Sequence, residues 1–458
     1  MKLISMLLLF VSATFASAGE VVEAFPDITL TWVGVLAIII FVVGYYFIAT
    51  EDKYHVDKAK PALFIGTFMF MLIGLYYVLN DIDLNLLHTG INHLILEIAG
   101  IFFFLFVAMT YIETLIHMGV FERLKYNLVS EGYTYKKLYW ITGFLAFFIS
   151  PIADNLTTAL ILSTVLITID KSNVKFLVPG AINIVVAANA GGAWSPFGDI
   201  TTLMVWTAGK GIFTDFLYLF PASFIGYLVT AFLLYYCVPP EKPSFDISNE
   251  KKPELMPGAN IVIGFGVLTI ALAVISHQVF HFPAMWGMLF GLSLLKLYSI
   301  RIKRKFNAHL NIFESIAKIE NNTLLFFFGI LAAVGALYFI GWLSLAVVVY
   351  DPNVLGATWS NIAVGFLSAF VDNVPVMSAV LKANPNMGLD QWMLVTLTAG
   401  IGGSLISFGS AAGVGVMGKM PGVYTFSNHM KYAWTVLIGY VISVGIWYFQ
   451  YEILGVMH

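Results

Sequence analysis

The chain has 458 residues, of which 59% are hydrophobic and 11% are charged, and its mean hydropathy is +0.87. Soluble domains average about 25% charged residues, so this composition predicts an all-α polytopic membrane protein without a sizeable soluble domain. The formal net charge is only −3, and no basic patch carries interleaved aromatic residues, which excludes a nucleic-acid partner. The single cysteine, Cys237, excludes a disulfide framework and a cysteine-based metal site.

The chain opens with a segment typical of a signal peptide, residues 1–18. Lys2 is its charged start, an apolar stretch follows, and Ala16-Ser17-Ala18 matches a cleavage site. The apolar stretch is short for a membrane span, so we predict cleavage. An uncleaved first helix is the alternative.

Two sets of six apolar runs follow, on either side of a proline-rich polar linker at residues 239–258. This division predicts a first repeat at 19–238 and a second at 259–458. The runs of the first set are 29–49, 61–79, 91–120, 138–169, 176–208 and 213–238, and those of the second are 259–277, 283–300, 323–350, 359–381, 390–420 and 432–455.

Loop charge predicts how these runs cross the membrane, because cytoplasmic loops carry an excess of Lys and Arg. Basic residues precede and follow the run 138–169, so this run enters and leaves on the cytoplasmic side as a re-entrant hairpin. The linker and the basic stretch 301–305 also fall on the cytoplasmic side, which leaves the run 359–381 as a hairpin that enters from outside. The two halves therefore form inverted-topology repeats.

The same polar phrase, F-x-S-x-x-x-D-N, occurs in both predicted hairpins, at residues 148–155 and 366–373. It places Asp154-Asn155 and Asp372-Asn373 at the hairpin tips. An Asp at the centre of a span costs about 2.5–3.5 kcal/mol on insertion scales, so we favour a functional role for both pairs. The alternative is that each pair only caps the helix that follows, and the two roles are compatible.

A second matched phrase, rich in glycine, interrupts two later runs at residues 191–199 and 402–410. Such interruptions predict discontinuous transmembrane helices, whose open ends offer backbone groups to ions. Close helix packing through small residues is the alternative for the glycines alone. The polar residues around the two breaks are Asn189, Ser195, Asp199, Thr201, Thr202, Ser404, Ser407 and Ser410.

One further acid, Glu113, lies deep in the run 91–120. The next basic residue is Arg123, so the helical rise puts Glu113 about 15 Å from that anchor, near the midplane. A proton-carrying or ion-orienting role is our interpretation, and a packed, protonated Glu is the alternative. His117, one turn further on, is either a proton relay or an interfacial histidine. The counterpart of Glu113 in the second half is Leu337, so this acid belongs to one half only.

The sign of these charges indicates the substrate. Asp154, Asp199, Asp372 and Glu113 are acids, and no Lys or Arg lies centrally in the hairpins or the interrupted runs. A cavity of carboxylates, amides and hydroxyls suits a small hard cation bound by oxygen ligands. Proton and cation compete for a buried carboxylate, because each neutralises the same charge. We predict Na⁺ ligands at Asp154, Asp372, Asn155 and Asn373, and no cofactor.

As a set, the phrases S-P-I-A-D-N-L-T-T, N-A-G-G-A-W-S-P-F-G-D-I-T-T and F-V-D-N-V-P resemble NhaD-type sodium/proton antiporters of the ion transporter superfamily. The resemblance implies exchange of Na⁺ or Li⁺ for H⁺ across the bacterial inner membrane at alkaline pH, as part of pH homeostasis. It also implies a scaffold with a moving transport domain in a homodimer. The family's functional positions fall on Glu113, Ser150, Asp154, Asn155, Asn189, Asp199, Thr201, Thr202, Asp372, Asn373, Ser407 and Ser410.

Two other functions are the alternatives to a cation antiporter. An anion carrier for dicarboxylates, or an arsenite exporter, has the same layout in this superfamily but neutral Ser-Asn-Thr tips, so the aspartates argue against it. An intramembrane hydrolase needs a paired nucleophile and base or an H-E-x-x-H motif, and the sequence has neither.

Overall fold

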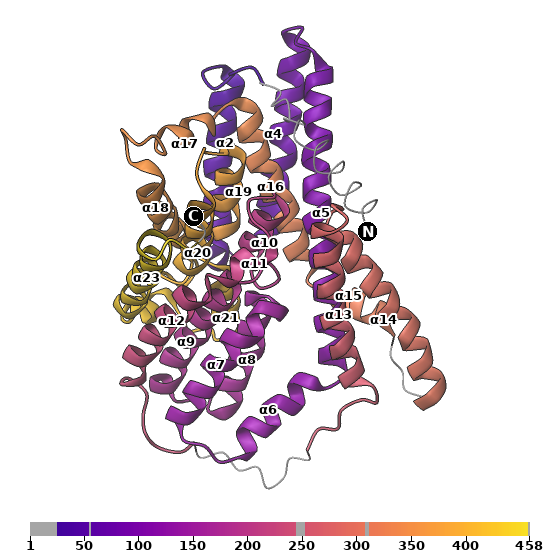
Figure 1. Cartoon of the computed structure of the whole chain (residues 1–458), viewed down its shortest axis with the longest axis vertical. Coiled ribbons are helices and arrows are strands. Elements are labelled where there is room, and N and C mark those ends of the chain that lie inside the picture. Colours follow the sequence, from indigo (N-terminus) through magenta and orange to yellow (C-terminus); the bar gives the residue numbers. More distant parts are fainter. Residues whose placement is uncertain (1–24, 55, 244–251, 307–310, 457–458) are drawn as a thin grey trace, which may run out of the picture.

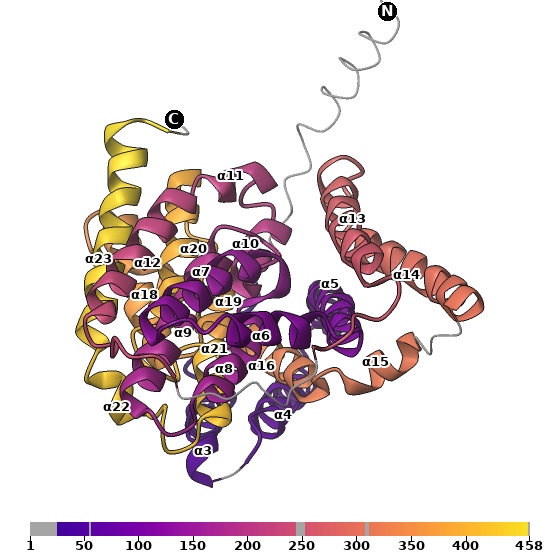
Figure 2. The same cartoon turned by 90° about the horizontal axis from the view of Figure 1, so that it is seen from below.

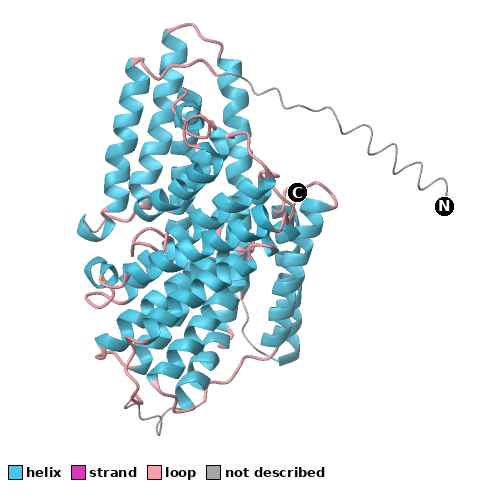
Figure 3. Ribbon diagram, turned by 60° about the vertical axis from the view of Figure 1, so that its left-hand side comes forward, coloured by secondary structure: helices cyan, strands magenta, loops and turns pink. Residues whose placement is uncertain are grey.

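The computed structural model describes residues 25–54, 56–243, 252–306 and 311–456. Every regular element in these ranges is a helix, as Figure 3 shows by colour. The predicted signal peptide, residues 1–18, lies outside the described residues, and so does part of the linker, residues 244–251.

Eight helical segments within the described ranges are long and apolar enough to cross a membrane, so the chain is a multi-pass membrane protein. A slightly shorter apolar helix, α2 (Trp32–Ala49), precedes them. The eight are α4 (Ala59–Leu79), α5 (Leu84–His117), α9 (Val174–Ala193), α11 (Phe213–Leu217) with α12 (Phe220–Tyr235), α13 (Ala259–Gln278), α14 (Met285–Phe306), α16 (Asn321–Ile340) and α23 (Ala433–Tyr448) with its π-helical continuation (Phe449–Ile453).

Both runs predicted to be hairpins are pairs of helices joined at an Asp-Asn phrase. Helix α7 (Tyr135–Ala153) meets α8 (Asn155–Ile169) at Asp154. Helix α18 (Gly356–Phe370) meets α19 (Asn373–Ala383) at Asp372, after Val371. Polar residues with good capping propensity at these junctions explain why a new helix begins there.

Both glycine-rich phrases break a helix, as predicted. Helix α9 ends at Ala193 and α10 (Ile200–Thr207) begins after Asp199. Helix α20 (Leu389–Gly402) is followed by α21 (Ala411–Lys419), which begins after Ser410.

Several short helices have no counterpart among the predicted apolar runs, because they are polar or lie inside loops. The two longest are α6 (Val120–Ser130) and α15 (Ile312–Lys318), each carrying charged residues. The others are α3 (Glu51–Tyr54) and α22 (Phe426–Met430). Helix α17 (Ser344–Val348) instead lies within the predicted run 323–350, which a turn after Ile340 divides.

The buried centre of the molecule is α9, in which every residue from Phe176 to Ala193 is buried. It packs against α7, α8, α12 and α20, and α20 packs in turn against α18. Seen from below, in Figure 2, α13, α14 and α15 lie to one side, next to α5. Figure 1 shows the same group diverging from the rest of the bundle. The broken helices and the hairpin junctions thus meet in the interior.

Candidate ion-binding site

Four helices begin at this interior site, each with a side-chain cap supplied by a residue that the sequence singled out. Asp154 caps α8, Asp199 caps α10, Asp372 caps α19 and Ser410 caps α21. Helix N-termini carry a partial positive charge and unpaired N–H groups, so they stabilise carboxylates. The capping role that the sequence left open is therefore confirmed for both hairpin aspartates.

Asp154 has an unusual backbone, with φ 56° and ψ 161°. Its carboxylate accepts hydrogen bonds from the backbone N–H and the hydroxyl of Thr157, at 2.8 and 2.7 Å. A non-glycine residue in this region stores strain of about 1–3 kcal/mol and persists only where its surroundings enforce it. Such strain is common at functional positions, and Asp154 lies at the junction of α7 and α8, where its side chain is a candidate ion ligand.

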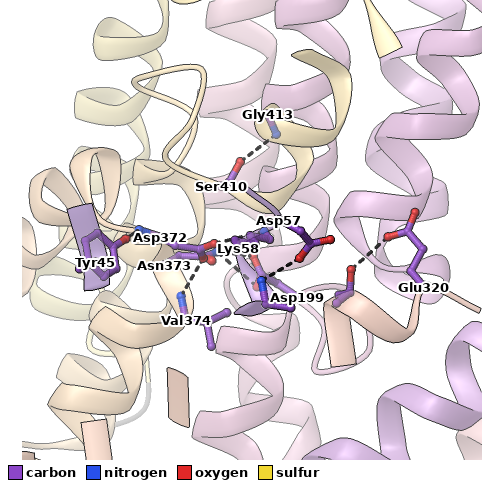
Figure 4. Close-up of polar contacts among 12 residues, drawn as sticks. Tyr45, Asp57, Lys58, Asp199, Glu320, Asp372, Asn373, Val374, Ser410 and Gly413 are labelled. Atoms are coloured by element: carbon purple, nitrogen blue, oxygen red, sulfur yellow. Dashed lines mark hydrogen bonds and ion pairs between the residues drawn. The ribbon is translucent and has the colours of Figure 1, made fainter. Parts of the chain in front are cut away.

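Asp372 is held by three different elements, and Figure 4 shows its neighbours. Its carboxylate caps Val374 at 3.3 Å, and its backbone N–H donates to the Tyr45 hydroxyl at 2.7 Å. The Lys58 ammonium lies 4.0 Å from its Oδ2. The carboxylate is buried, so the hydrogen-bond donors and the nearby cation offset its lost hydration.

Asp199 accepts hydrogen bonds from both halves of the chain. Its Oδ2 accepts from Asn155 at 3.0 Å and from Asn373 at 3.1 Å, and its Oδ1 accepts from the N–H of Thr201 at 3.0 Å. All of these groups are buried. Hydrogen bonds to an ionised carboxylate are strong, so these three donors fix Asp199 in position.

Asn189 links the two helix breaks. Its Nδ2 donates to the hydroxyls of Ser404 and Ser410, both at 2.8 Å, while its Oδ1 accepts from Asn155 at 3.1 Å. The amide thereby connects α9, α21 and the first hairpin in one buried network. Ser404 was noted beside the break in the sequence, and this geometry gives it a partner.

Other predicted residues hold the scaffold of the site. The Ser150 hydroxyl donates to the Ala188 carbonyl at 2.6 Å, and Ser368 makes the matching bond to Ala399 at 2.8 Å in the second half. The Thr202 hydroxyl is 3.4 Å from the Gly192 carbonyl. The Ser407 hydroxyl is buried and has no hydrogen-bond partner among the described residues.

Glu113 lies apart from this network. It is half-buried on α5 and lines a cavity of about 320 Å³ together with Thr157 and Glu320. Thr157 is the residue that binds Asp154, so the cavity reaches the edge of the site. His117 is exposed on the same helix.

The structure adds one charge to the site from outside the hairpins and broken helices. The hairpins and broken helices carry no central Lys or Arg, but Lys58, at the start of α4, reaches Asp372 from another element. Tyr45, on α2, was missed in the same way. The only signal in the sequence is a lysine just before an apolar run.

A cation at this site would need mixed ligands. The described residues contain no group of three or more His, Cys, Asp or Glu side chains placed to hold one metal ion. Amide, hydroxyl and backbone oxygens would therefore have to complete the coordination of a bound cation. Hard monovalent cations accept such oxygen ligands.

Comparisons with known proteins agree on one class. A family model described as "citrate transporter" matches residues 45–400. The chain is 40% identical to a Na⁺/H⁺ antiporter NhaD of Alkalimonas amylolytica, over 96% of this chain and 94% of the relative. It is also 40% identical to a Na⁺/H⁺ antiporter NhaD of Vibrio cholerae, over 91% of this chain and 92% of the relative. A sodium/proton antiporter of Arabidopsis thaliana is 29% identical over 89% of this chain.

These relatives are named as transporters and not as enzymes, so the chain is a transporter. The chain belongs to the transporter family that the citrate-transporter model describes, and within it to the NhaD Na⁺/H⁺ antiporters.

Proposed function

We propose that this chain exchanges Na⁺, or Li⁺, for H⁺ across the bacterial inner membrane by alternating access. The observation that carries the proposal is the buried Asp199 carboxylate, which Asn155 and Asn373 reach from the two hairpin junctions. An intramembrane carboxylate is stable only when it is paired, protonated or bound to a cation. A group that either H⁺ or Na⁺ neutralises, but not both at once, couples the movement of one ion to the other.

The residues have different roles in this proposal. Asp154 and Asp372 bind the cation, with Asn155 and Asn373 beside them, because their carboxylates have fewer hydrogen-bond donors than that of Asp199. Asp199 fixes the network and competes for the proton. The remaining proposed positions shape the breaks or pass protons to the site, and they are Glu113, Ser150, Asn189, Thr201, Thr202, Ser407 and Ser410.

We further propose that residues 19–238 and 259–458 are inverted repeats, with hairpin α7–α8 entering from the cytoplasm and α18–α19 from outside. Matched local contacts support a duplication. Asp154 and Asp372 cap equivalent helices, and so do Asp199 and Ser410. In an inverted pair, rocking the hairpins and broken helices against the remaining helices exposes one site to each side in turn.

A cavity of about 680 Å³ provides access in this proposal. Its lining includes Asp57, Lys58, Leu156, Glu320 and Gly415. Leu156 follows Asn155 in the chain, so the cavity lies next to the first hairpin junction. Lys58 lies in the loop between the runs 29–49 and 61–79, which also carries Lys53 and Lys60. An excess of lysine marks a cytoplasmic loop, so we infer that the cavity opens to the inside.

Four further parts of the proposal rest on the resemblance or on the sequence pattern. They are cleavage after residue 18, assembly as a homodimer, a place in the inner membrane, and a part in pH homeostasis.

An anion carrier for citrate, dicarboxylates or arsenite is the alternative, and the description of the family model favours it. The site argues against it. The buried carboxylates of Asp199 and Asp372 and the half-buried carboxylate of Asp154 lie at the junctions, and the Lys58 ammonium contacts that of Asp372. An anion placed there would meet like charges at close range, which is unfavourable in a medium of low dielectric constant.

The test uses the purified protein in proteoliposomes with an acidified lumen and a pH-sensitive dye. Na⁺ and Li⁺ should each release protons across a range of pH, and K⁺ at the same concentration serves as the ion control. Asp154→Asn and Asp372→Asn should both abolish the signal while the protein remains folded and inserted. Wild-type exchange by both variants would refute the site, and uptake of labelled citrate or succinate would revive the anion carrier.

A further inference from the structure

Lys58 lies in a polar loop but is largely buried beside Asp372, and the proposed exchange of Na⁺ for H⁺ gives this lysine no role. It immediately precedes α4, and its side chain is only 17% exposed. Its ammonium lies 4.0 Å from Asp372 Oδ2 and 4.4 Å from the centre of the Phe326 ring. A partly buried ammonium is therefore held between an aromatic face and a proposed cation ligand, as Figure 4 shows for Asp372.

The neighbouring acid, Asp57, is engaged elsewhere. Its Oδ1 accepts from the N–H of Ala59 at 2.8 Å, and its Oδ2 accepts from Asn322 at the start of α16. These bonds fix the start of α4 against α16 and leave the Lys58 side chain to face Asp372. The Asp57 carboxylate thus fixes the backbone at the start of α4, and this orients the Lys58 side chain toward Asp372.

We propose that Lys58 is an internal cation that occupies Asp372 when no Na⁺ is bound, so that Na⁺ binding displaces its ammonium. This inference rests on the proposed function. An ammonium and a Na⁺ each supply one positive charge and each need the same carboxylate oxygen. Both at once would place two cations beside one carboxylate, which Coulomb repulsion disfavours.

The cavity beside Lys58 carries other carboxylates that the displaced ammonium could face. Lys58 lines the 680 Å³ cavity, whose walls also carry the carboxylates of Glu51 and Glu320. The pair with Asp372 joins α4 to the junction of the second hairpin, which are different elements. Its exchange for Na⁺ therefore also removes a contact between the hairpin tip and α4, which frees the tip to move once the ion is bound.

The first experiment uses the wild-type protein, so it does not depend on a variant that folds. Purified protein is treated with an amine-reactive reagent in NaCl or in choline chloride of equal ionic strength, and labelling of each lysine is measured by mass spectrometry. Na⁺ should raise labelling of Lys58 severalfold. Lys60, exposed on the same helix, should not change. Equal labelling of Lys58 in both salts would overturn the proposal.

The second experiment measures Na⁺ affinity from the Na⁺-dependent thermal stabilisation of purified protein. Removing a competing charge about 4 Å away, discounted for solvent screening, should make Lys58→Gln bind Na⁺ about tenfold more tightly. Lys58→Arg keeps the charge and should stay within about threefold of wild type, as should the control Lys60→Gln. Unchanged or weaker Na⁺ binding by a folded Lys58→Gln would contradict the proposal.

Labelling of Lys58 in an Asp372→Asn variant tests the direct pair. Lys58 should label there at the high level in both salts, because its partner is already gone. Labelling of Lys58 that still rises with Na⁺ in this variant would overturn the direct pairing. Failure of wild-type proteoliposomes to exchange Na⁺ for H⁺ would instead refute the proposed function, whereas exchange with no response of Lys58 would refute only this inference.

Discussion

Asn155 and Asn373 donate to the same atom, Asp199 Oδ2, at 3.0 and 3.1 Å, although they lie in opposite halves of the chain. Each follows the aspartate at a helix junction, and Asp199 caps the helix after the first break. One buried carboxylate therefore binds both hairpins to a broken helix. Removing either amide should therefore weaken the hydrogen bond that the other makes to Asp199.

The first prediction concerns this shared acceptor. A hydrogen bond to a charged group contributes about 1.5–3 kcal/mol, so Asn155→Ala and Asn373→Ala should each lower the free energy of unfolding by about that amount. In the double variant the effects should not add, because loss of one donor already loosens the carboxylate that the other holds. Denaturation of the purified variants in detergent measures the free energy of unfolding of the two single variants and the double variant. If the double variant lost the sum of the two single losses, Asn155 and Asn373 would not act through a shared acceptor.

The second prediction concerns backbone packing between hairpins and broken helices. A Cβ added at Gly191 would lie 2.3 Å from the Phe147 carbonyl oxygen, and one at Gly402 would lie 2.2 Å from the Gly365 carbonyl oxygen. These contacts are with backbone, which cannot move aside, so Gly191→Ala and Gly402→Ala should each destabilise the protein by about 1–3 kcal/mol or more.

The matched control is Gly264→Ala in α13, where an added Cβ meets nothing within 4 Å. Replacing a glycine inside a helix by alanine removes an entropic penalty, so this variant should gain about 0.5–1 kcal/mol. The melting temperature in detergent compares the three variants. Equal melting temperatures would mean that the hairpins do not pack on the broken helices as described.

The sequence predicts those features of the site that depend on local sequence pattern, namely where helices end and begin. An Asp-Asn phrase or a glycine pair inside an apolar run marks where one helix ends and another begins, and the four caps lie at those positions. Their polarity also predicts their burial in a shared interior, because a lipid-facing carboxylate is too unfavourable.

The part that sequence does not predict depends on how helices pack. Lys58 reaches Asp372 because α4 begins beside the second hairpin junction, and no spacing in the sequence encodes that approach. Glu113 has the polarity of a site residue, but the rotation of α5 turns it toward a neighbouring cavity. Helices α6 and α15 were missed because they are too polar to stand out as apolar runs.

The third prediction concerns the ion pair between Lys382, at the end of α19, and Glu97 on α5. The Glu97 side chain is 42% exposed, and exposed pairs contribute about 0–1 kcal/mol. Glu97→Gln and Lys382→Gln should therefore each change the exchange rate by less than about fivefold. Proteoliposome exchange measures this, and a loss as complete as that of Asp372→Asn would show that the pair belongs to the ion site.

The fourth prediction separates a site amide from a structural amide within one helix. Asn189 and Asn183 are both buried on α9. Asn183 donates to the Tyr139 carbonyl at 2.9 Å, away from the site, whereas Asn189 connects Asn155 with Ser404 and Ser410. Replacing either by alanine leaves buried polar groups unpaired, so both variants should lose about 1–3 kcal/mol of stability.

Of the two variants, only Asn189→Ala should lose most of its transport activity, because only Asn189 belongs to the hydrogen-bond network of the site. Without this amide the Ser410 cap and Asn155 lose a common partner, and the two breaks are no longer held in one arrangement. We expect Asn189→Ala to reduce Na⁺-driven proton exchange more than tenfold per folded molecule, and Asn183→Ala to stay within about threefold of wild type. Equal rates for the two variants, measured at equal reconstituted amounts, would show that Asn189 contributes only to stability.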